Sequence, residues 1–471
     1  MSLSSTLGRW LGLEGPENAP RPKSTLTDRA PAPAPRNPAR TSLTAPVPFP
    51  RFRATAGDQL GAADSAFART RMKLLESFTP SQPVSDRKRF AGRLDVLTAV
   101  IRAIEEQRLH VVVYGERGLG KTSVMHVLTQ AARDARYLVV YVSCGADSNF
   151  DEVFRTIAAH IPMLFHSAVG PTSPDVEKGK TLADILPKST ISPRIASDIL
   201  AKIVGTRVVV VLDEFDRSSS EEFRQNVAEL IKNLSDRLVR VQIVIAGVAG
   251  NLTELLEHIP SIQRNIFALQ VPWMPPGEIR QLVRTGGELC GLNFEEEAED
   301  AVVSAAHGSP YLATLLGHHA ALTALDDQRT RVGRSDVLTA IGAAILEFQG
   351  RMSGRARVLL RKYAGSEKTP YLGIVAGVSL LSNGFFRMED LWASTVNAEN
   401  ARRCEEAVAE LIGAGLLLEH QTEEGRLYRF AEDGIAAYLW LLSVEAKLRD
   451  AQAQQAVEPS FSLTAQQELQ S

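Results

Sequence analysis

A lysine and a threonine follow a glycine-rich turn near residue 120, with the spacing that binding of a triphosphate requires. The stretch Gly115-Glu116-Arg117-Gly118-Leu119-Gly120-Lys121-Thr122-Ser123 fits the pattern GxxxxGK[ST] at every fixed position. Its glycines let the backbone curl so that successive N–H groups point inward at an anion. Lys121 is expected to reach the β- and γ-phosphates, and the Thr122 hydroxyl to occupy one Mg²⁺ position. All nine residues are therefore candidate nucleotide-binding residues.

The elements around this turn are those that the chemistry needs. An apolar, β-branched run over 111–114 predicts a buried strand, and 124–132 predicts a helix. A helix beginning near Lys121 would add the positive end of its dipole to the anion site. The alternative is a chance glycine-rich turn between a strand and a helix. The full pattern in this context favours phosphate binding.

Two acidic residues follow a second apolar run. Five aliphatic residues, 208–212, predict a parallel strand buried on both faces, and Asp213 and Glu214 come directly after it. The carboxyl ends of such strands form the ligand-binding edge of an open α/β sheet. We expect Asp213 to hold Mg²⁺ through its water shell and Glu214 to polarise the attacking water as a general base. Acids after a strand are more often solvated loop charge, but the phosphate-binding turn upstream favours the functional interpretation.

Three further positions leave two interpretations open. Asn251, after an apolar strand over 241–246, could hold the attacking water or the γ-phosphate, or could simply cap the next helix. Arg264 could complete a neighbouring subunit's site as an arginine finger, or could be a surface arginine. Gly308-Ser309-Pro310 could approach the nucleotide, or could open a helix with proline at its first position.

Composition excludes several classes of protein. Apolar residues make up 44% of the 471 residues and charged residues 23%, as in ordinary globular proteins. The net charge of −3 predicts no polyanion partner for the whole chain, so any nucleic-acid surface must be local. Three widely spaced cysteines indicate reduced thiols in a reducing cytosol. Since no apolar run approaches 18 residues and residues 1–13 lack a signal-peptide core, we expect a cytoplasmic protein without membrane contact.

The pattern along the chain changes several times. Residues 1–66 are rich in proline and predict a disordered tail, with a partner-docking arm as the alternative. A long surface loop or an insertion is expected over 167–192, and helices alone after Pro275-Pro276. Helices followed by a hairpin near residues 416–430 suggest a winged helix. The predicted domains are a tail (1–66), an α/β core (67–275), a helical lid (276–349), a winged-helix domain (350–450) and a flexible tail (451–471).

The ordered set of motifs resembles the AAA+/STAND group of P-loop ATPases, and most of all the bacterial and archaeal ATPases akin to replication initiators. The resemblance implies an α/β P-loop NTPase fold: a five-stranded parallel sheet, a helical lid and a C-terminal winged helix. It also implies ATP or ADP as the bound nucleotide, with Mg²⁺. The stretch Phe90-Ala91-Gly92-Arg93 would place Arg93 near the entrance of the adenine pocket, and Asn251 would be the first sensor.

The chain departs from the initiator pattern in the lid. Initiator-type ATPases carry a sensor arginine in the third lid helix, whereas residues 310–316 contain no arginine. The Gly-x-Pro form matches the STAND pattern instead and implies a nucleotide contact by Pro310. We therefore expect slow, switch-like hydrolysis, and the resemblance leaves assembly into an oligomer open.

Three functions compete. The first is an ATPase switch whose lid and winged helix respond to nucleotide. The second is an ATP-gated DNA-binding regulator, favoured by a basic helix that carries Arg351, Arg355, Arg357, Arg361 and Lys362. Acids at 405, 406 and 410, in the helix best placed to enter a major groove, argue against DNA binding by that helix. The third is a nucleotide-stabilised scaffold without turnover. A protein partner bound through the N-terminal tail is a further expectation.

Overall fold

The computed structural model describes residues 66–237, 239–249, 260–382, 384–422, 425–432 and 434–457. All of them belong to one compact unit, Gln59–Ser471. Asn251, the proline-rich tail up to residue 65 and the last residues from 458 lie outside the described ranges.

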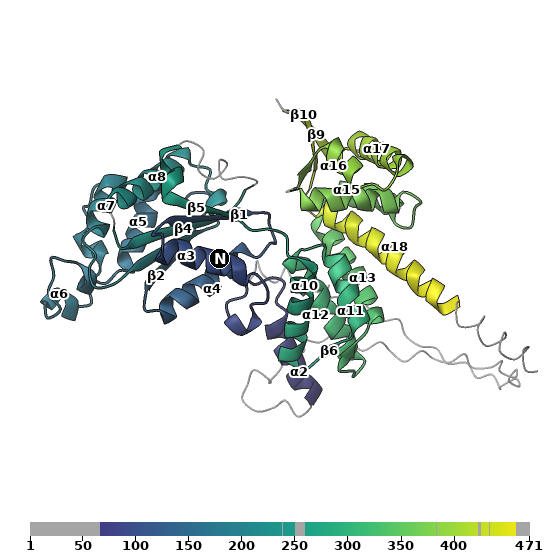
Figure 1. Cartoon of the computed structure of the whole chain (residues 1–471), viewed down its shortest axis with the longest axis horizontal. Helices are drawn as coiled ribbons and strands as arrows, with labels where there is room; N and C mark the ends of the chain where they lie inside the picture. The colour runs from purple at the N-terminus through teal and green to yellow at the C-terminus, as the bar shows by residue number, and fades with distance from the viewer. Residues whose placement is uncertain are drawn as a thin grey trace, which may run out of the picture. The chain divides into compact units, whose positions relative to one another are not determined.

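A five-stranded parallel sheet forms the first part of the described chain (Figure 1). Its order is β2-β3-β4-β1-β5, and every neighbouring pair is parallel. The strands are β1 (His110–Gly115), β2 (Leu138–Ser143), β3 (Val208–Asp213), β4 (Val241–Val248) and β5 (Ile266–Gln270). This confirms the α/β P-loop fold expected from the sequence.

Both faces of the sheet are covered by helices, which explains the unbroken apolar runs in its strands. Every residue of β3 is buried, and its successive side chains enter two different hydrophobic cores. On one face Val210 and Leu212 pack with α5 (Phe150–Ala159), α7 (Pro193–Leu200) and α8 (Glu221–Asp236). On the other face Val209 and Val211 pack with α3 (Leu94–Glu105) and α4 (Lys121–Asp134).

The expectation of a long loop over 167–192 was wrong in part. This stretch contains α6 (Pro174–Glu177) and the 3₁₀ helix η3 (Leu182–Ile185), and η2 (Met163–Phe165) precedes it. Isolated β-bridges tie Pro162 to Thr181 and His166 to Ile203. The serines and prolines that suggested a loop serve as caps: Ser173 accepts a hydrogen bond from the Asp175 N–H at the start of α6.

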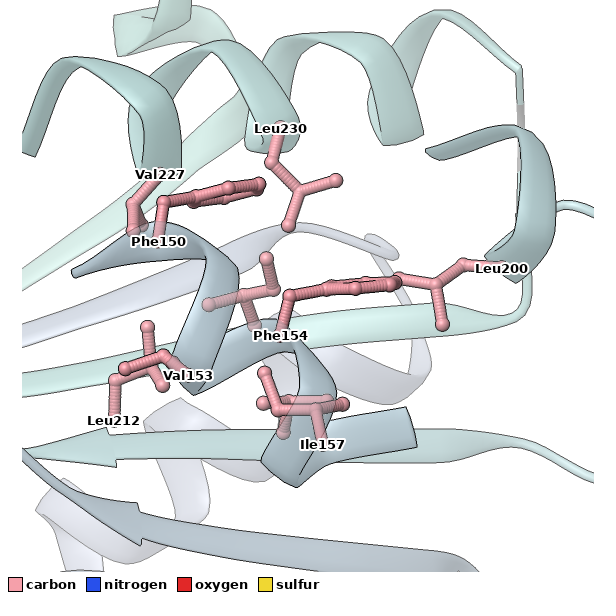
Figure 2. A pocket seen from close by; sticks show the side chains of 10 residues that line it. Phe150, Val153, Phe154, Ile157, Leu200, Leu212, Val227 and Leu230 are labelled. Carbon is pink, nitrogen blue, oxygen red and sulfur yellow. The ribbon is translucent and has the colours of Figure 1, made fainter. Parts of the chain in front are cut away.

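A small apolar cavity lies between the sheet and helices α5, α7 and α8 (Figure 2). Its volume is about 10 Å³, which is at the lower limit for one water molecule. The lining consists of Phe150, Val153, Phe154, Ile157, Leu200, Val210, Leu212, Val227, Leu230 and Ile243. With no polar side chain in this lining, the cavity is a packing defect and not a ligand site.

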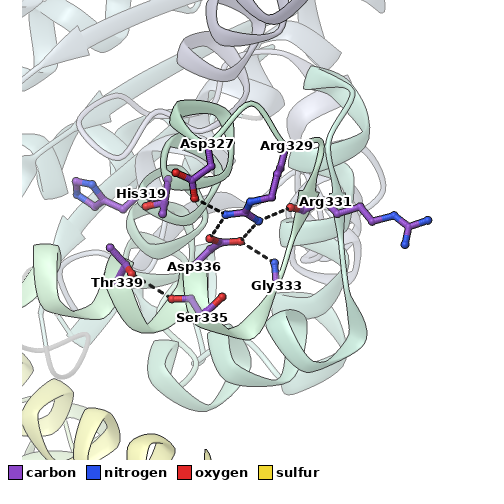
Figure 3. A network of polar contacts seen from close by, with 9 residues as sticks. His319, Asp327, Arg329, Arg331, Gly333, Ser335, Asp336 and Thr339 are labelled. Atoms are coloured by element: carbon purple, nitrogen blue, oxygen red, sulfur yellow. Dashed lines mark hydrogen bonds and ion pairs between the residues drawn. The ribbon is translucent and has the colours of Figure 1, made fainter.

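The predicted lid region is largely helical. Its helices are α10 (Pro276–Cys290), α11 (Glu296–Ala306), α12 (Pro310–Asp326) and α13 (Arg334–Arg351). The expectation of helices alone was wrong, because β6 (Asn293–Phe294) pairs with β7 (Arg331–Val332). The turn into α13 is held by Arg329, which donates to both carboxylate oxygens of the buried Asp336 at 2.9 and 2.6 Å (Figure 3).

The C-terminal region is helical with a small antiparallel sheet of order β8-β10-β9. Its elements are α14 (Gly354–Leu360), η6 (Arg361–Tyr363), α15 (Thr369–Leu381), β8 (Phe385–Phe386), α16 (Met388–Ala393), α17 (Ala398–Gly413), β9 (Leu417–Thr422), β10 (Gly425–Phe430) and α18 (Ile435–Val457). The hairpin and the helices before it match the predicted elements, while β8 was not predicted. Neither α18 nor any other helix in the described part of the chain has the length and apolar character to cross a membrane.

One hydrophobic core extends through the lid and the C-terminal region, whereas the sheet has two cores of its own. The N-terminal helix α2 (Ala66–Ser77) and Phe78 also belong to the lid core. The ring of Phe78 fills a slot between α10 and α12, where a Cβ on Gly286 or Gly317 would overlap it. The segment after Phe78 returns to the sheet, because the N–H of Val84 donates to Ser123 Oγ at 3.0 Å.

Candidate nucleotide site

The glycine-rich turn joins β1 to α4 at the carboxyl edge of the sheet, in the strand–turn–helix context that the sequence predicted. Gly115, Gly118 and Gly120 have φ values of 144°, 82° and 81°. L-residues with a side chain rarely adopt these values, so the motif's glycines are required by the backbone path. A Cβ on Gly115 would also lie 3.0 Å from the carbonyl oxygen of Val271.

Lys121 is buried beneath this turn. Its ammonium group donates to the carbonyl oxygens of Gly115 at 2.8 Å and Glu116 at 2.6 Å. An ammonium has three donors, so one remains for an anion. Burial lowers the pKa of Lys121 to about 8, while the charges of Asp216, Glu116 and Asp213 act to raise it. Lys121 and Asp213 thus lie in one electrostatic environment, on the same side of the sheet.

Asp213 ends β3 with its carboxylate almost entirely buried. One oxygen accepts a short hydrogen bond from the Tyr141 hydroxyl, and the other accepts from the Glu214 N–H at 2.9 Å. Burial and the neighbouring Asp213 raise the pKa of Tyr141 well above its ordinary value, so the phenol stays a donor. Each carboxylate oxygen keeps a second lone pair, and the donor set fits a magnesium ion that uses few protein ligands.

Glu214 is held by two neighbours in a left-handed backbone conformation with φ of 54°. Its carboxylate accepts from Ser143 Oγ at 2.9 Å and forms an ion pair with Arg217 at 2.8 Å. The hydrogen bond from Arg217, opposed by partial burial and reinforced by Ser143, lowers the pKa of Glu214 below its ordinary value. A non-glycine residue in this region of backbone space is uncommon and is enriched at functional sites.

Sequence reasoning missed three residues of this site: Ser143, Tyr141 and Asp216. Asp216 accepts a hydrogen bond from the Val248 N–H at the end of β4, at 2.7 Å. Among the carboxylates near Lys121, it raises the lysine pKa most. A third acid three positions after Asp213 was a visible signal. The roles of Ser143 and Tyr141 follow only from the pairing of β2 with β3.

Arg93 is a buried cation with unsatisfied nitrogens. It is 4% exposed and precedes α3 in a left-handed conformation with φ of 56°. One Nη donates to the carbonyl oxygen of Pro272 at 2.8 Å, whereas Nε and the other Nη are buried without a partner among the described residues. Its charge contributes to lowering the pKa of Lys121. A buried cation with unsatisfied nitrogens, whose charge also acts on the buried Lys121, is in an environment that an anion would stabilise.

The first turn of α12 lies against the phosphate loop. A Cβ on Gly118 would lie 3.4 Å from the Cβ of Tyr311 and 4.0 Å from Ser309 Oγ. Pro310 takes the first helical position of α12, and Ser309 caps it by accepting from the Leu312 N–H at 3.3 Å. The two interpretations of this turn are therefore compatible: it opens a helix, and it borders the loop.

The remaining candidates differ in their surroundings. Thr122 is the second residue of α4 and is half-buried, while Leu119 is buried in the core under the loop. Ser123 is the acceptor for the lead-in segment described above. Arg264 is exposed in the 3₁₀ helix η5 (Pro260–Asn265), before β5. Asn251 is outside the described residues, so its two interpretations stay open.

Comparison with known proteins gives one family match and several partial relatives. A family model described as Novel STAND NTPase 1 matches residues 75–351, more than half of the chain. The ORC1-type DNA replication protein of Thermoplasma volcanium is 24% identical over 217 residues, 45% of this chain and 48% of that protein. The Holliday junction branch migration complex subunit RuvB of Kosmotoga olearia is 22% identical over 225 residues, 48% of this chain and 55% of that protein. The chain spans about half the length of the curated relatives it matches.

Two solved structures are similar at low identity. The structure of Cdc6p from Pyrobaculum aerophilum is 13% identical and matches with a TM-score of 0.42, over 80% of this chain and 98% of that chain. The Aeropyrum pernix ORC1 protein, solved in complex with DNA, is 16% identical and matches with a TM-score of 0.41, over 79% of this chain and 95% of that chain.

Proposed function

Because this chain belongs to the Novel STAND NTPase 1 family, a group of AAA+/STAND-type P-loop ATPases, we propose that it binds and hydrolyses ATP as a molecular switch. One observation carries the proposal. The buried Lys121, the unsatisfied Arg93 and the carboxylates of Asp213 and Asp216 share one electrostatic environment beside the glycine turn. Cations for a triphosphate and carboxylates for its metal are thus assembled at one edge of the sheet, and Glu214 directly follows Asp213 there.

In this proposal the turn from Gly115 to Ser123 and the ammonium of Lys121 bind the phosphates, and Arg93 and Pro310 border the rest of the nucleotide. Thr122 and Asp213 would hold Mg²⁺, which neutralises phosphate charge when it is bound. Asn251 as first sensor and Arg264 as arginine finger remain proposals that depend on the family resemblance.

Glu214 would polarise the attacking water. Its lowered pKa keeps the carboxylate ionised at neutral pH. Its hydrogen bonds with Ser143 and Arg217 hold the carboxylate in place, so it is not free to move to an attacking water. Hydrolysis would then need Glu214 to leave Arg217, which supports the expectation of slow turnover.

Contacts on either side of the Gly308-Ser309-Pro310 turn would carry the nucleotide state to the C-terminal region. The ring of His307 packs against Trp440 of α18 with centroids 4.0 Å apart and planes tilted by 34°, and its Nε2 lies 3.2 Å from the carbonyl oxygen of Gly377 in α15. On the other side, the hydroxyl of Tyr311 accepts at 2.7 Å from Arg351, the last residue of α13, directly before the C-terminal region. We propose that the C-terminal region is a winged helix that moves together with the lid.

Phosphate release measured on two variants tests the proposal. We expect E214Q to keep ATP affinity and to lose at least about 100-fold in turnover, because a general base contributes about that much. K121A should lose nucleotide binding. The exposed Glu229 on α8 offers a matched control, and E229Q should behave as wild type. Undiminished turnover in E214Q would remove Glu214 from the mechanism, and unchanged affinity in K121A would contradict the phosphate site.

Among the described residues, nothing favours the alternative in which α17 reads a DNA groove. Arg402 and Arg403 both pair with Glu399, at 3.1 and 3.0 Å, and with Glu406. A catalytically silent scaffold is disfavoured by the intact pair of Asp213 and Glu214. A protein partner for the N-terminal tail, and an oligomer, remain predictions.

A further inference from the structure

Positive charge is concentrated at the start of the C-terminal region. Residues 351–457 hold 13 basic and 14 acidic residues, so the region as a whole is not basic. Six of those basic residues lie within 351–368, against a single acid, Glu367. This short segment comprises the last residue of α13, then α14, η6 and the turn that follows them.

Three arginines of this segment are free. Arg355, Arg357 and Arg361 are exposed and make no side-chain hydrogen bond or ion pair within the described part of the chain. The other basic residues are occupied: Lys362 and Lys368 both pair with Glu410. Arg351 is bound by Tyr311 and Glu347.

The geometry presents two of the free guanidinium groups together. The N–H of Arg361 bonds to the carbonyl oxygen of Arg357, so the helical turn continues between them. Residues four apart lie on one helix face with Cβ atoms about 5–6 Å apart. The Nη2 of Arg355 comes within 3.3 Å of a Cβ position on Gly415, so this arginine lies against the turn between α17 and β9. The three arginines are thus all carried by the exposed part of one short helical segment, two of them on one face.

The ligand chemistry follows from the residue types. All three free cations are arginines, whose forked donors match phosphate oxygens in two parallel hydrogen bonds. The only aromatic residue of α14 and η6, Tyr363, is buried, so this surface offers no ring for stacking on bases. Such a surface suits a phosphate backbone, and without a ring it offers no platform on which the unpaired bases of a single strand could stack.

We propose that Arg355, Arg357 and Arg361 form a docking surface for the phosphate backbone of a duplex nucleic acid. The contact is independent of sequence, and it involves α14 instead of α17. It requires no nucleotide, so it goes beyond the proposed ATPase function and does not depend on it.

Fluorescence anisotropy of the full chain with a 30-base-pair DNA duplex of arbitrary sequence, without nucleotide, tests this proposal. Three phosphate contacts predict that log K falls with log salt with a slope of about −3 between 50 and 200 mM KCl. In R357Q/R361Q the slope should become shallower by about 2, and affinity at 50 mM should fall about tenfold or more. R402Q/R403Q on α17 is the matched control and should keep both the affinity and the slope.

Several results would overturn the proposal. One is that the wild type does not bind the duplex at 50 mM salt. Another is that R402Q/R403Q loses binding while R357Q/R361Q keeps the affinity of the wild type. A third is tighter binding to phosphatidylserine vesicles than to the duplex. A parallel titration with duplex RNA identifies which backbone is preferred, and either preference supports the proposal. Phosphate release by R357Q/R361Q should equal that of the wild type, so failure of the docking surface and failure of the ATPase proposal are separable.

Discussion

Lys121 is a charged group placed where burial disfavours its charge. Its pKa is lowered to about 8 by burial, even though three carboxylates act to raise it. In the unfolded chain the same lysine has its ordinary pKa of about 10.5. At neutral pH the charged Lys121 therefore lowers the stability of the folded protein, and a bound triphosphate would offset this loss. That is the behaviour expected of a residue kept for binding and not for stability.

This cost has a pH dependence with a definite sign. The lysine pKa is lower in the folded state, so between pH 8 and 10.5 the unfolded chain binds more protons and stability contributed by Lys121 rises with pH. We expect the stability of K121M relative to wild type to fall by about 2–3 kcal/mol between pH 7 and 10.5. Urea unfolding of both proteins at the two pH values measures this. A difference that does not change with pH would contradict the buried, charged lysine.

The pair of Glu214 and Arg217 gives a second prediction at this scale. R217A removes the first cause of the lowered Glu214 pKa and frees the carboxylate, so phosphate release should rise a few-fold. R237A, which removes an exposed ion pair with Asp198 elsewhere on the sheet region, is the control and should leave the rate unchanged. A rate in R217A at or below that of the wild type would show that the arginine supports turnover.

At the scale of elements, α2 belongs to the lid although it precedes the sheet in sequence. Arg71 pairs with Asp326 of α12 at 2.7 Å, and Nδ1 of His318 lies 3.0 Å from the carbonyl oxygen of Phe78. The Phe78 ring occupies a slot that exists because two lid helices carry glycine at the point of contact. The chain therefore connects lid and sheet twice, once through the segment after Phe78 and once through residues 271–276.

A double-mutant cycle tests the slot. A Cβ on Gly317 would lie 2.6 Å from the Phe78 ring, so G317A should destabilise the protein by about 1–3 kcal/mol through overpacking. In the F78A background the clash is gone, and G317A should instead stabilise by about 0.5–1 kcal/mol through helix propensity. Denaturant unfolding of the four proteins gives the coupling. Equal effects of G317A in both backgrounds would refute the contact.

At the scale of the whole chain, the cores divide the protein differently from the sequence patterns. Lid and C-terminal region share one hydrophobic core, which includes Leu316 of α12, Ile341 of α13 and Tyr438 of α18. Gln349 of α13 also donates to the Tyr438 hydroxyl at 3.0 Å. A shared core makes the two regions one cooperative unit.

Hydrogen exchange under increasing denaturant tests this unit. Amides of α12, α13, α15 and α18 should exchange through one opening event with a common free energy and a common denaturant slope. Amides of β1, β3 and β4 should form a separate group, since they lie in different cores. If α15 and α18 open at a distinctly lower free energy than α12 and α13, the C-terminal region is independent of the lid.

The nucleotide site was largely readable from the sequence because its signals are local. The turn over 115–123 and the acids at the end of β3 have fixed spacings. Each follows a strand whose two buried faces produce an unbroken aliphatic run. Strand ends of a parallel sheet meet at one edge, so the meeting of these two motifs also followed from sequence. The roles of Tyr141, Ser143 and Asp216 did not follow from the sequence, because these side chains form hydrogen bonds to residues at the ends of neighbouring strands.

Tertiary structure alone decided which groups are free and which are occupied. The sequence shows five basic residues in the helix near 355. Only the fold shows that Lys362 is paired with Glu410, while Arg357 and Arg361 have no side-chain partner in the described part of the chain. In the same way, only the fold shows Glu214 paired with Arg217 and Phe78 inserted into the lid. Charge pairing and packing join residues that are distant along the chain, and no periodicity or motif records such contacts.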